Sequence, residues 1–351
     1  MIEEAKDAII LDTGSYSCKA GLSKHEAPPL VIRTLVSFPK GSSTPSCFGR
    51  ECLEKPDELF DTRPLVNYQD PDWERIEKFW GELSIVNPDI NFARKPLMTG
   101  YQPRSSKFFR EKVAQIFFES FNVPNYFTTN DALLILYSSG RVNGLVLDCG
   151  HSYTSLVPIY DGSPLMHAQI SQNFSGSDIT NFLQKSLKLK SLKEVTEIKE
   201  TELQVSLDYA RDSAALASLP DGEKIVASAK LNAAESLFVP EIADSTSPGP
   251  HELAFEALLK TDNDLRREFS NNLIVSGGTT SLPNYSERLQ REMTQLLPGI
   301  LKVRCQSLPD RSQSVWLGGA IVSSVAHFRT MWVSKAEYDE IGPAVVSRKC
   351  V

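Results

Sequence analysis

Residues 145–158, LVLDCGHSYTSLVP, decide the fold: an apolar strand leads into an aspartate and a small-residue turn, and a second strand follows. Residues 8–21, AIILDTGSYSCKAG, repeat this plan near the N-terminus. Asp12 and Asp148 stand at matching places in the two stretches. The repetition predicts an α/β protein with two related halves that face a shared ligand in a central cleft.

The turns of these hairpins have the chemistry of a phosphate site. Backbone N–H groups around Gly14 and Ser15 can line an anion, and Lys19 would add a positive charge. Asp12 would hold a hydrated divalent cation. The alternative interpretation is a plain β-hairpin whose lysine is solvated.

A third glycine-rich turn lies late in the chain. A predicted strand at 272–275 leads into SGGTT at 276–280, and a helix follows from Ser286. Such a turn lets a nucleotide approach the backbone closely. An ordinary strand-to-helix turn would use the same residue types.

Composition sets broad limits on the function. A chain of 351 residues with 41% hydrophobic residues can build two domains with good cores. The net charge of -7 argues against a nucleic acid or an anionic membrane as the main partner. The six cysteines form no CxxC pair, which disfavours zinc and favours reduced thiols in an intracellular protein. The acidic start is no signal peptide, and no apolar stretch approaches the roughly 20 residues of a membrane span.

Periodicity and turn chemistry predict most of the elements. Asp72 caps a helix whose inward face carries Trp73, Ile76, Trp80 and Leu83. Further predicted helices cover residues 106–121, 131–139, 175–187, 186–210, 252–259 and 314–328. Further predicted strands cover 30–38, 95–98 and 219–228, and an exposed loop covers 243–252.

Five segments of the chain resemble actin and the actin-related proteins, in actin's order. They are LYSSGRVNGLVLDCG (136–150), VPIYDGSPLMHA (157–168), IKETELQVSLDYA (198–210), VSGGTTSLPNYSERLQREM (275–293) and the C-terminal run SVWLGGAIVSSVAHFRTMWVSKAEYDEIGPAVVSRKCV (314–351). The resemblance covers nearly the whole chain. It identifies a divergent member of the actin superfamily.

The resemblance implies the actin fold, which is shared with Hsp70 chaperones and sugar kinases. Two lobes, each with a five-stranded mixed sheet flanked by helices, hold ATP and a divalent cation between them. Residues 1–138 with 315–351 would form the first lobe, including a shortened subdomain 2 at about 32–62. Residues 139–314 would form the second lobe, with subdomain 4 at about 176–249.

The resemblance also assigns the ligand and its contacts. The implied cofactor is ATP or ADP with Mg²⁺ or Ca²⁺, and Asp12 and Asp148 match the aspartates that hold the cation through water. The implied nucleotide-binding positions are Gly14, Ser15, Tyr16, Lys19, Gly150, Ser152, Tyr153, Lys199, Glu200, Gly277, Gly278 and Thr279. From pattern alone, the charge-rich helix around 199–200 is a solvated face.

Several positions depart from actin's pattern. Asp131, His151 and Ser155 stand where actin has Gln, Asp and His, the residues that orient the water that attacks the γ-phosphate. Hydrolysis of a phosphoanhydride depends on positioning and electrostatics, so we expect little or no hydrolysis and no confident catalytic residue. Asp131 would serve as a base only while placing negative charge near a polyanion.

Departures on the adenine side point the same way. Leu282, Ser312 and Thr196 replace a Tyr, a Lys and an Arg, and Tyr16 replaces a glycine close to a phosphate. We therefore expect weak or structural nucleotide binding.

Two segments argue against polymerisation. The chain between Phe38 and Phe48 is too short for actin's long inserting loop, and the loop at 243–252 (ADSTSPGPHE) lacks actin's apolar plug. Both changes remove buried area from filament contacts. We expect a monomer that joins a defined assembly.

One binding surface of actin is retained in its residue types. Tyr137, Gly140, Val142, Val322 and Val325 match a groove in which an amphipathic helix of a partner can lie. The alternative is that this stripe is core.

The leading hypothesis is a non-polymerising structural subunit of a cytoskeletal, axonemal or other complex, in the cytoplasm, with protein partners that include actin itself as a candidate. The alternatives are an active ATPase that forms or joins actin-like filaments, and a nuclear subunit of a chromatin-remodelling complex. A sugar kinase is disfavoured because the actin-like C-terminal tail is intact. No basic cluster indicates nuclear import.

Overall fold

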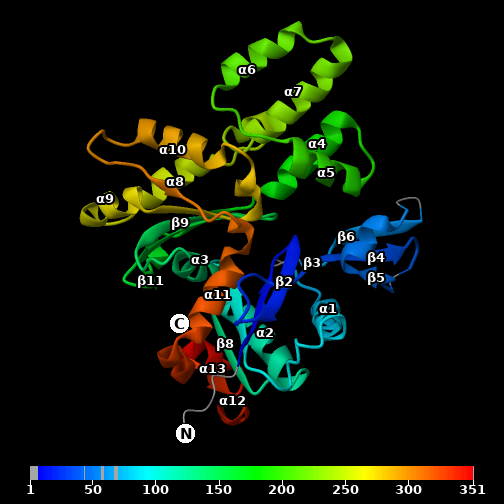
Figure 1. Ribbon diagram of the computed structural model, residues 1–351, viewed down its shortest axis with the longest axis vertical. Coiled ribbons are helices and arrows are strands. Elements are labelled where there is room, and N and C mark those ends of the chain that lie inside the picture. Colours follow the sequence, from blue (N-terminus) through cyan, green and yellow to red (C-terminus); the bar gives the residue numbers. More distant parts are fainter. Residues whose placement is uncertain (1–6, 43, 57–58, 67–69, 351) are drawn as a thin grey trace. The chain divides into compact units, whose positions relative to one another are not determined.

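The computed structural model describes residues 7–42, 44–56, 59–66 and 70–350, which form two compact units (Figure 1). The first unit combines residues up to 141 with those from 313 onward, and the second spans 142–312. The sequence placed these boundaries at 138/139 and 314/315. The acidic start, residues 1–6, lies outside the described residues.

The first unit contains a six-stranded mixed sheet in the order β15-β8-β7-β1-β2-β3 among its described residues. The strands are β1 (Ile9–Thr13), β2 (Ser17–Leu22), β3 (Leu30–Arg33), β7 (Leu97–Tyr101), β8 (Asn125–Asn130) and β15 (Val333–Ser334). β1 and β2 form an antiparallel hairpin, and β7 runs parallel to β1 on its other side.

The second unit repeats this arrangement. Its sheet has the order β11-β10-β9-β13-β14, and β12 also pairs with β10. The strands are β9 (Gly144–Cys149), β10 (Thr154–Tyr160), β11 (Ser163–Pro164), β12 (Ile170–Gln172), β13 (Leu273–Ser276) and β14 (Cys305–Gln306). β9 and β10 form the antiparallel hairpin, and β13 runs parallel to β9. The duplication is therefore present in the strand order, with six described strands in each sheet where five were expected.

Local signals place the helices of the first unit. They are α1 (Trp73–Val86), α2 (Lys107–Glu119), α3 (Asp131–Ser138), α11 (Ser314–Ser324), α12 (Lys335–Ile341) and α13 (Ala344–Lys349). Asp72 caps α1 by accepting a hydrogen bond from the backbone N–H of Arg75, as predicted. α11 ends at Ser324, earlier than expected, and a 3₁₀ helix, η7 (Ala326–Met331), follows it.

Small residues let α11 pack closely inside the first unit. A Cβ on Gly318 would lie 1.9 Å from the Leu134 carbonyl oxygen of α3, and one on Gly319 would lie 2.7 Å from a methyl group of Ile10. The indole N–H of Trp316 donates to the Ile10 carbonyl over 3.1 Å. α11 therefore supports the back of β1, the strand that leads into the first turn.

A three-stranded sheet follows β3. It has the order β5-β4-β6 and consists of β4 (Leu35–Pro39), β5 (Cys47–Phe48) and β6 (Phe60–Pro64), with the 3₁₀ helix η1 (Gly49–Glu54). The predicted single strand at 30–38 is thus two strands in different sheets. The change occurs at Thr34, whose N–H and hydroxyl bond to the turn between β1 and β2.

The second unit has a core of its own and is rich in helices. They are α4 (Gly176–Leu187), α5 (Leu192–Glu202), α6 (Tyr209–Ala215), α7 (Asp221–Glu235), α8 (Pro250–Leu259), α9 (Asn263–Asn271) and α10 (Tyr285–Leu296). Figure 1 shows α6 and α7 side by side. None of the helices in the described part of the chain has the length and apolar character of a membrane span.

Two predictions for the second unit were wrong. The helix expected over 186–210 is broken, because Leu203 and Val205 turn into the core after α5 ends. The strands expected at 219–228 are instead the start of α7. Acidic residues in its first turn favour a helix there, and the buried Ala233 and Ala234 further along hold it against the unit.

Candidate functional site

An ion pair crosses the first hairpin. Asp12 on β1 is directly opposite Lys19 on β2, and the Lys19 ammonium lies 2.9 Å from an Asp12 carboxylate oxygen. Both side chains are nearly buried, with 13% and 11% of their surface exposed. The interpretation with a solvated lysine is therefore wrong. Asp12 and Lys19 therefore form a nearly buried ion pair at the end of the hairpin.

The turn that joins β1 and β2 is held from behind. The Gly14 N–H donates to the Ser17 carbonyl, while Thr34 donates its hydroxyl to the Gly14 carbonyl (2.9 Å) and its N–H to the Tyr16 carbonyl (3.1 Å). Ser15 is buried. Because carbonyl oxygens repel anions, binding them to Thr34 leaves the turn suited to meet a phosphate with its N–H groups.

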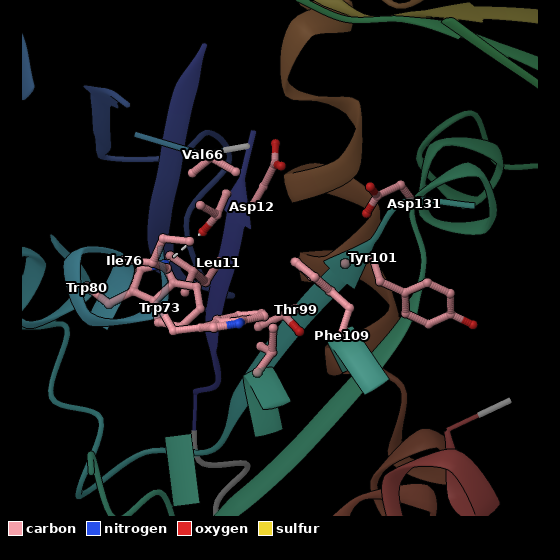
Figure 2. A pocket seen from close by; sticks show the side chains of 13 residues that line it. Leu11, Asp12, Val66, Trp73, Ile76, Trp80, Thr99, Tyr101, Phe109 and Asp131 are labelled. Carbon is pink, nitrogen blue, oxygen red and sulfur yellow. Dashed lines mark hydrogen bonds between the residues drawn. The ribbon is translucent and has the colours of Figure 1, made fainter. Parts of the chain in front are cut away.

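A cavity in the first unit brings Asp12 and Asp131 together (Figure 2). Asp131 opens α3, and a Cβ on Gly100 of β7 would lie only 1.9 Å from its carboxylate, so the bare backbone of β7 makes room for it. The other lining residues are mainly apolar and aromatic: Leu11, Thr13, Val66, Trp73, Ile76, Trp80, Thr99, Tyr101, Phe109 and Val113. Two carboxylates on one cavity attract cations and disfavour an unshielded polyanion.

The second hairpin carries its aspartate in the same place but with different neighbours. Asp148 on β9 is opposite Ser155 on β10 and level with Ser276 on β13. Residues directly opposite each other point to the same face of a sheet, so Ser155 lies beside Asp148. Ser155 is 1% exposed, and its hydroxyl has no hydrogen-bond partner among the described residues. A serine thus stands opposite Asp148 at the position where the first hairpin has Lys19 opposite Asp12.

Hydroxyl groups hold the turn between β9 and β10. The Gly150 carbonyl accepts hydrogen bonds from Ser175 Oγ and Thr279 Oγ1, each at 2.6 Å. The Gly150 N–H donates to the Tyr153 carbonyl, and the Ser177 N–H donates to the His151 carbonyl. The N-terminus of α4 and the glycine-rich turn are therefore both tied to this hairpin.

Gly277 reaches the same hairpin from β13. Its φ of +95° favours glycine, and a Cβ there would lie 2.2 Å from the Cys149 carbonyl oxygen and 2.8 Å from an Asp148 carboxylate oxygen. A side chain at this position would fill the space beside Asp148. Gly277 and Asp148 are thus neighbours, as the sequence comparison implied for the phosphate region.

Lys199 is not part of a solvated face. Its ammonium donates to the Gly176 carbonyl (2.5 Å) and to Thr180 Oγ1 (3.2 Å), both on α4. A Cβ on Gly176 would lie 2.3 Å from Thr279 Oγ1 and 3.0 Å from the Lys199 ammonium. Gly176 therefore belongs to the site, although sequence reasoning used it only to start a helix. Its signal is the SGSD capping box at 175–178.

The positions that depart from actin on the adenine side, together with the remaining nucleotide-binding positions Glu200, Ser152 and Tyr153, lie as follows. Leu282 is 8% exposed and belongs to the core of the second unit, and Thr196 is likewise buried on α5. Ser312 and Glu200 are exposed. Ser152 and Tyr153 lie in the turn after Gly150. Leu282, Thr196, Ser312 and Glu200 carry no aromatic ring that could stack on a base.

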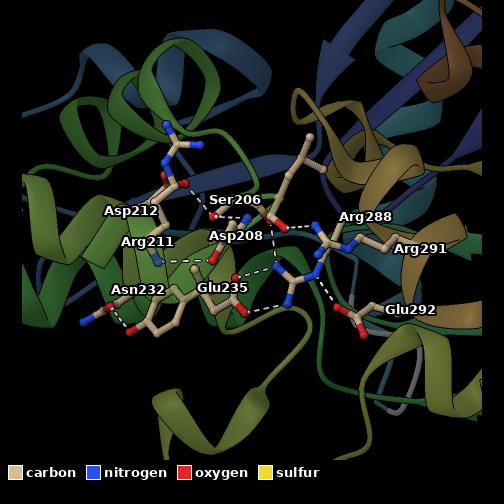
Figure 3. A network of polar contacts seen from close by, with 11 residues as sticks. Ser206, Asp208, Arg211, Asp212, Asn232, Glu235, Arg288, Arg291 and Glu292 are labelled. Atoms are coloured by element: carbon tan, nitrogen blue, oxygen red, sulfur yellow. Dashed lines mark hydrogen bonds and ion pairs between the residues drawn. The ribbon is translucent and has the colours of Figure 1, made fainter. Parts of the chain in front are cut away.

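A buried ionic network supports the segment after α5 (Figure 3). The Arg288 guanidinium of α10 makes two hydrogen bonds to the Glu235 carboxylate of α7, at 2.8 and 3.0 Å, and a third to Glu292. It also donates to the Ser206 carbonyl over 2.7 Å. This network holds residues 203–208 against α7 and α10.

The predicted partner groove is divided between core and surface. Val322 is 4% exposed and belongs to the core of the first unit, so the alternative interpretation as core is correct for it. Val325 and Gly140 are exposed in the first unit, and Tyr137 is half-buried there. Val142 is exposed and is the first residue of the second unit.

The cysteines are all free thiols. Burial raises the pKa of Cys18, Cys52 and Cys305 to about 12, so these thiols stay protonated at neutral pH. Within the described ranges, no three His, Cys, Asp or Glu side chains gather into a set that could ligate a metal directly. A cation at Asp12 or Asp148 would therefore keep most of its water ligands.

Comparison with known proteins decides the family. The family described as Actin matches residues 3–196 and 192–351, nearly the entire chain. The chain belongs to the actin family. It is 33% identical, over 380 aligned residues, to "Putative actin-29" of Dictyostelium discoideum, covering 98% of this chain and 97% of the relative. The two-lobed α/β fold agrees with this assignment.

Actin-family proteins generally bind a nucleotide with a divalent cation. Taken one unit at a time, the glycine turns suit the phosphates of such a group. In the second unit, a Cβ on Gly277 or Gly176 would lie 2.2 or 2.3 Å from a polar atom, and in the first unit a Cβ on Gly14 would lie 3.1 Å from the Ser17 carbonyl oxygen. Asp12 in the first unit and Asp148 in the second are each able to bind a hydrated cation, and Lys19 already pairs with Asp12. The nucleoside side fits less well, because Leu282 is turned into the core.

Proposed function

We propose that this actin-family protein is a non-polymerising structural subunit of a larger protein assembly, and that it holds ATP or ADP with little hydrolysis. We place it in the cytoplasm, on the cytoskeleton. The observation that carries the proposal is the pair Asp148 and Ser155: the cation-holding carboxylate is kept, and the neighbouring water-orienting position has only a short, buried hydroxyl.

Slow hydrolysis follows from this chemistry. A bound divalent cation would supply electrostatic stabilisation of the phosphates, but attack by water also needs a positioned acceptor for its proton. Ser155 is a poor proton acceptor. Asp131 could accept a proton, but it lines a cavity that Asp12 shares, and its charge opposes a nearby polyphosphate.

The segment between β4 and β5 supports a protein that does not polymerise. The Ser46 N–H donates to the Ser37 carbonyl, and the Lys40 N–H donates to the Leu59 carbonyl. The connection therefore closes within a few residues and offers no long loop for insertion into a neighbour. The predicted loop at 243–252 ends earlier than expected, since α8 begins at Pro250. Its residues 243–248 are mainly polar and alternate between half-buried and exposed, so they offer little apolar area to a neighbouring subunit.

Bound nucleotide and its turnover test the first half of the proposal. Purified protein is denatured and its released nucleotide quantified, and phosphate release is then followed for hours with excess MgATP. We expect bound or exchangeable nucleotide and phosphate release well below one per minute. Brisk turnover would instead support an active ATPase.

Sedimentation tests the second half. Pure protein in Mg²⁺ and KCl at concentrations that polymerise actin should remain in the supernatant as a monomer. Pelleting with a critical concentration would contradict the proposal. Affinity purification from native extract, followed by identification of stoichiometric partners, would then distinguish a cytoskeletal complex from a chromatin-remodelling one.

A further inference from the structure

Tyr16 and Arg33 form a stacked pair at the first phosphate turn. The Arg33 guanidinium carbon lies 3.6 Å from the centroid of the Tyr16 ring, and Arg33 Nη1 donates to the Tyr16 hydroxyl over 2.9 Å. Arg33 ends β3, directly opposite Ser17 of β2, and the next residue, Thr34, binds the Tyr16 carbonyl. Backbone and side chain thus both fix this arginine to the turn.

The contact with Tyr16 does not satisfy every hydrogen-bond donor of the Arg33 guanidinium. Arg33 Nε is buried and has no hydrogen-bond partner among the described residues. A buried cationic donor without a partner costs free energy unless a ligand satisfies it. A guanidinium presents several donors in a planar fork that matches the oxygens of a phosphate group.

The charge balance of the turn also calls for this cation. Lys19 is paired with Asp12, so together they contribute no net charge to a phosphate at the turn. Asp131 adds a negative charge to the shared cavity, and the whole chain carries a net charge of -7. Arg33, which contacts Tyr16 of the turn, adds a positive charge there.

We propose that Arg33, aligned by stacking on Tyr16, is an additional phosphate-binding residue, and that it makes the protein select polyphosphates by their phosphate chain. This role explains the bulky side chain of Tyr16, because its ring orients Arg33 by stacking. The glycine that actin has at this position has no ring on which an arginine could stack. This inference rests on the proposed nucleotide site and adds a contact to it.

The test is calorimetric titration of the full chain with ATP, AMP, adenosine and inorganic tripolyphosphate. Arg33→Met keeps the stacked stem and removes the charge. We expect Arg33→Met to lower the affinity for ATP and tripolyphosphate about 10- to 100-fold, the range of a charge-assisted hydrogen bond. The affinity for adenosine should not change. Tyr16→Phe, which keeps the stacking, should change ATP affinity only a few-fold.

Arg63→Met is the matched control, because Arg63 also stacks on an aromatic ring, that of Phe38, in the small sheet. It should bind every probe as the wild type does. Tryptophan fluorescence checks folding of both variants, since all four tryptophans belong to the first unit.

The remaining outcomes separate this inference from the proposed function. Equal tripolyphosphate affinity in wild type and Arg33→Met, with ATP still bound, would overturn the role of Arg33 alone. Tighter binding in Arg33→Met would also overturn it, because the pair would then occlude the turn. A wild-type protein that binds none of the four probes would overturn the proposed nucleotide site and the role of Arg33 together.

Discussion

The hairpins β1–β2 and β9–β10 have the same strand plan, yet different forces hold them. In the first, a nearly buried ion pair between Asp12 and Lys19 joins the strands, and the arginine of β3 covers the turn. In the second, Ser155 stands opposite Asp148, and the hydroxyls of Ser175 and Thr279 hold the turn through the Gly150 carbonyl. The same strand arrangement is thus stabilised by an ion pair in one unit and by hydroxyl groups in the other.

This difference has consequences for stability. A buried charge that loses its partner costs several kcal/mol, whereas a lost neutral hydrogen bond costs about 1 kcal/mol. The second unit does contain a buried ionic network, but its printed contacts join α7, α10 and the Ser206 carbonyl and involve no residue of β9 or β10. Substitutions in each unit can therefore measure how much stability comes from buried ion pairs and how much from hydroxyl hydrogen bonds.

The largest effect is expected from Arg288→Met in the second unit. It leaves the Glu235 carboxylate, 2% exposed, without its cation, so the free energy of unfolding of that unit should fall by about 3–5 kcal/mol. Urea unfolding followed by circular dichroism measures this loss, while tryptophan fluorescence reports the first unit only. Arg291→Met, which removes an exposed contact with the Leu207 carbonyl, is the control. Equal effects of the two variants would contradict the assignment.

Lys19→Met should cost the first unit about 2–4 kcal/mol, because it leaves Asp12 charged and nearly buried. The double variant with Asp12→Asn should recover much of this loss. Lys24→Met breaks the exposed pair with Asp7 and should cost at most about 0.5 kcal/mol. Urea unfolding followed by tryptophan fluorescence provides the measurement. Additive effects at Asp12 and Lys19 would show that the hairpin does not depend on the ion pair.

Thr279→Val should destabilise the second unit by only about 1 kcal/mol, since the Gly150 carbonyl keeps the Ser175 hydroxyl. Thr201→Val, on the surface of α5, is the matched control and should have no measurable effect. A loss of 3 kcal/mol or more, again by circular dichroism, would mean that this hydroxyl matters as much as a buried charge, contrary to the comparison.

The smallest effect concerns pH. Burial lowers the pKa of His251, which packs beside Phe238 in the second unit, with Glu252, Glu292 and Arg288 nearby. A lowered histidine pKa means that the unfolded chain takes up the proton first. The stability contribution is therefore present above the ordinary pKa near 6.5 and declines as pH falls below it. The second unit should lose stability between pH 7 and 5, and His251→Gln should flatten that slope. An unchanged slope would contradict the role of His251.

Much of the fold followed from local patterns. The two hairpins, the Asp72 cap, α2, α3 and the strand-to-helix turn at 276–280 were predicted because apolar periodicity and turn residues act over short distances. The strands wrongly expected at 219–228 show the limit. Ile225 and Val226 favour a strand locally, but burial of Ala229, Ala233 and Ala234 further along decides for helix α7.

The sequence by itself determined which aspartates, glycines and hydroxyl-bearing residues occupy the turns of the site. It also determined that Asp131, His151 and Ser155 differ from actin's residues. Only the tertiary structure decided how these residues pair. It joined Lys19 to Asp12, Lys199 to Gly176, and Arg33 to Tyr16. The physical reason is that strand register and helix packing bring together groups 7 to 23 residues apart in the sequence, and burial then makes each pairing costly to break.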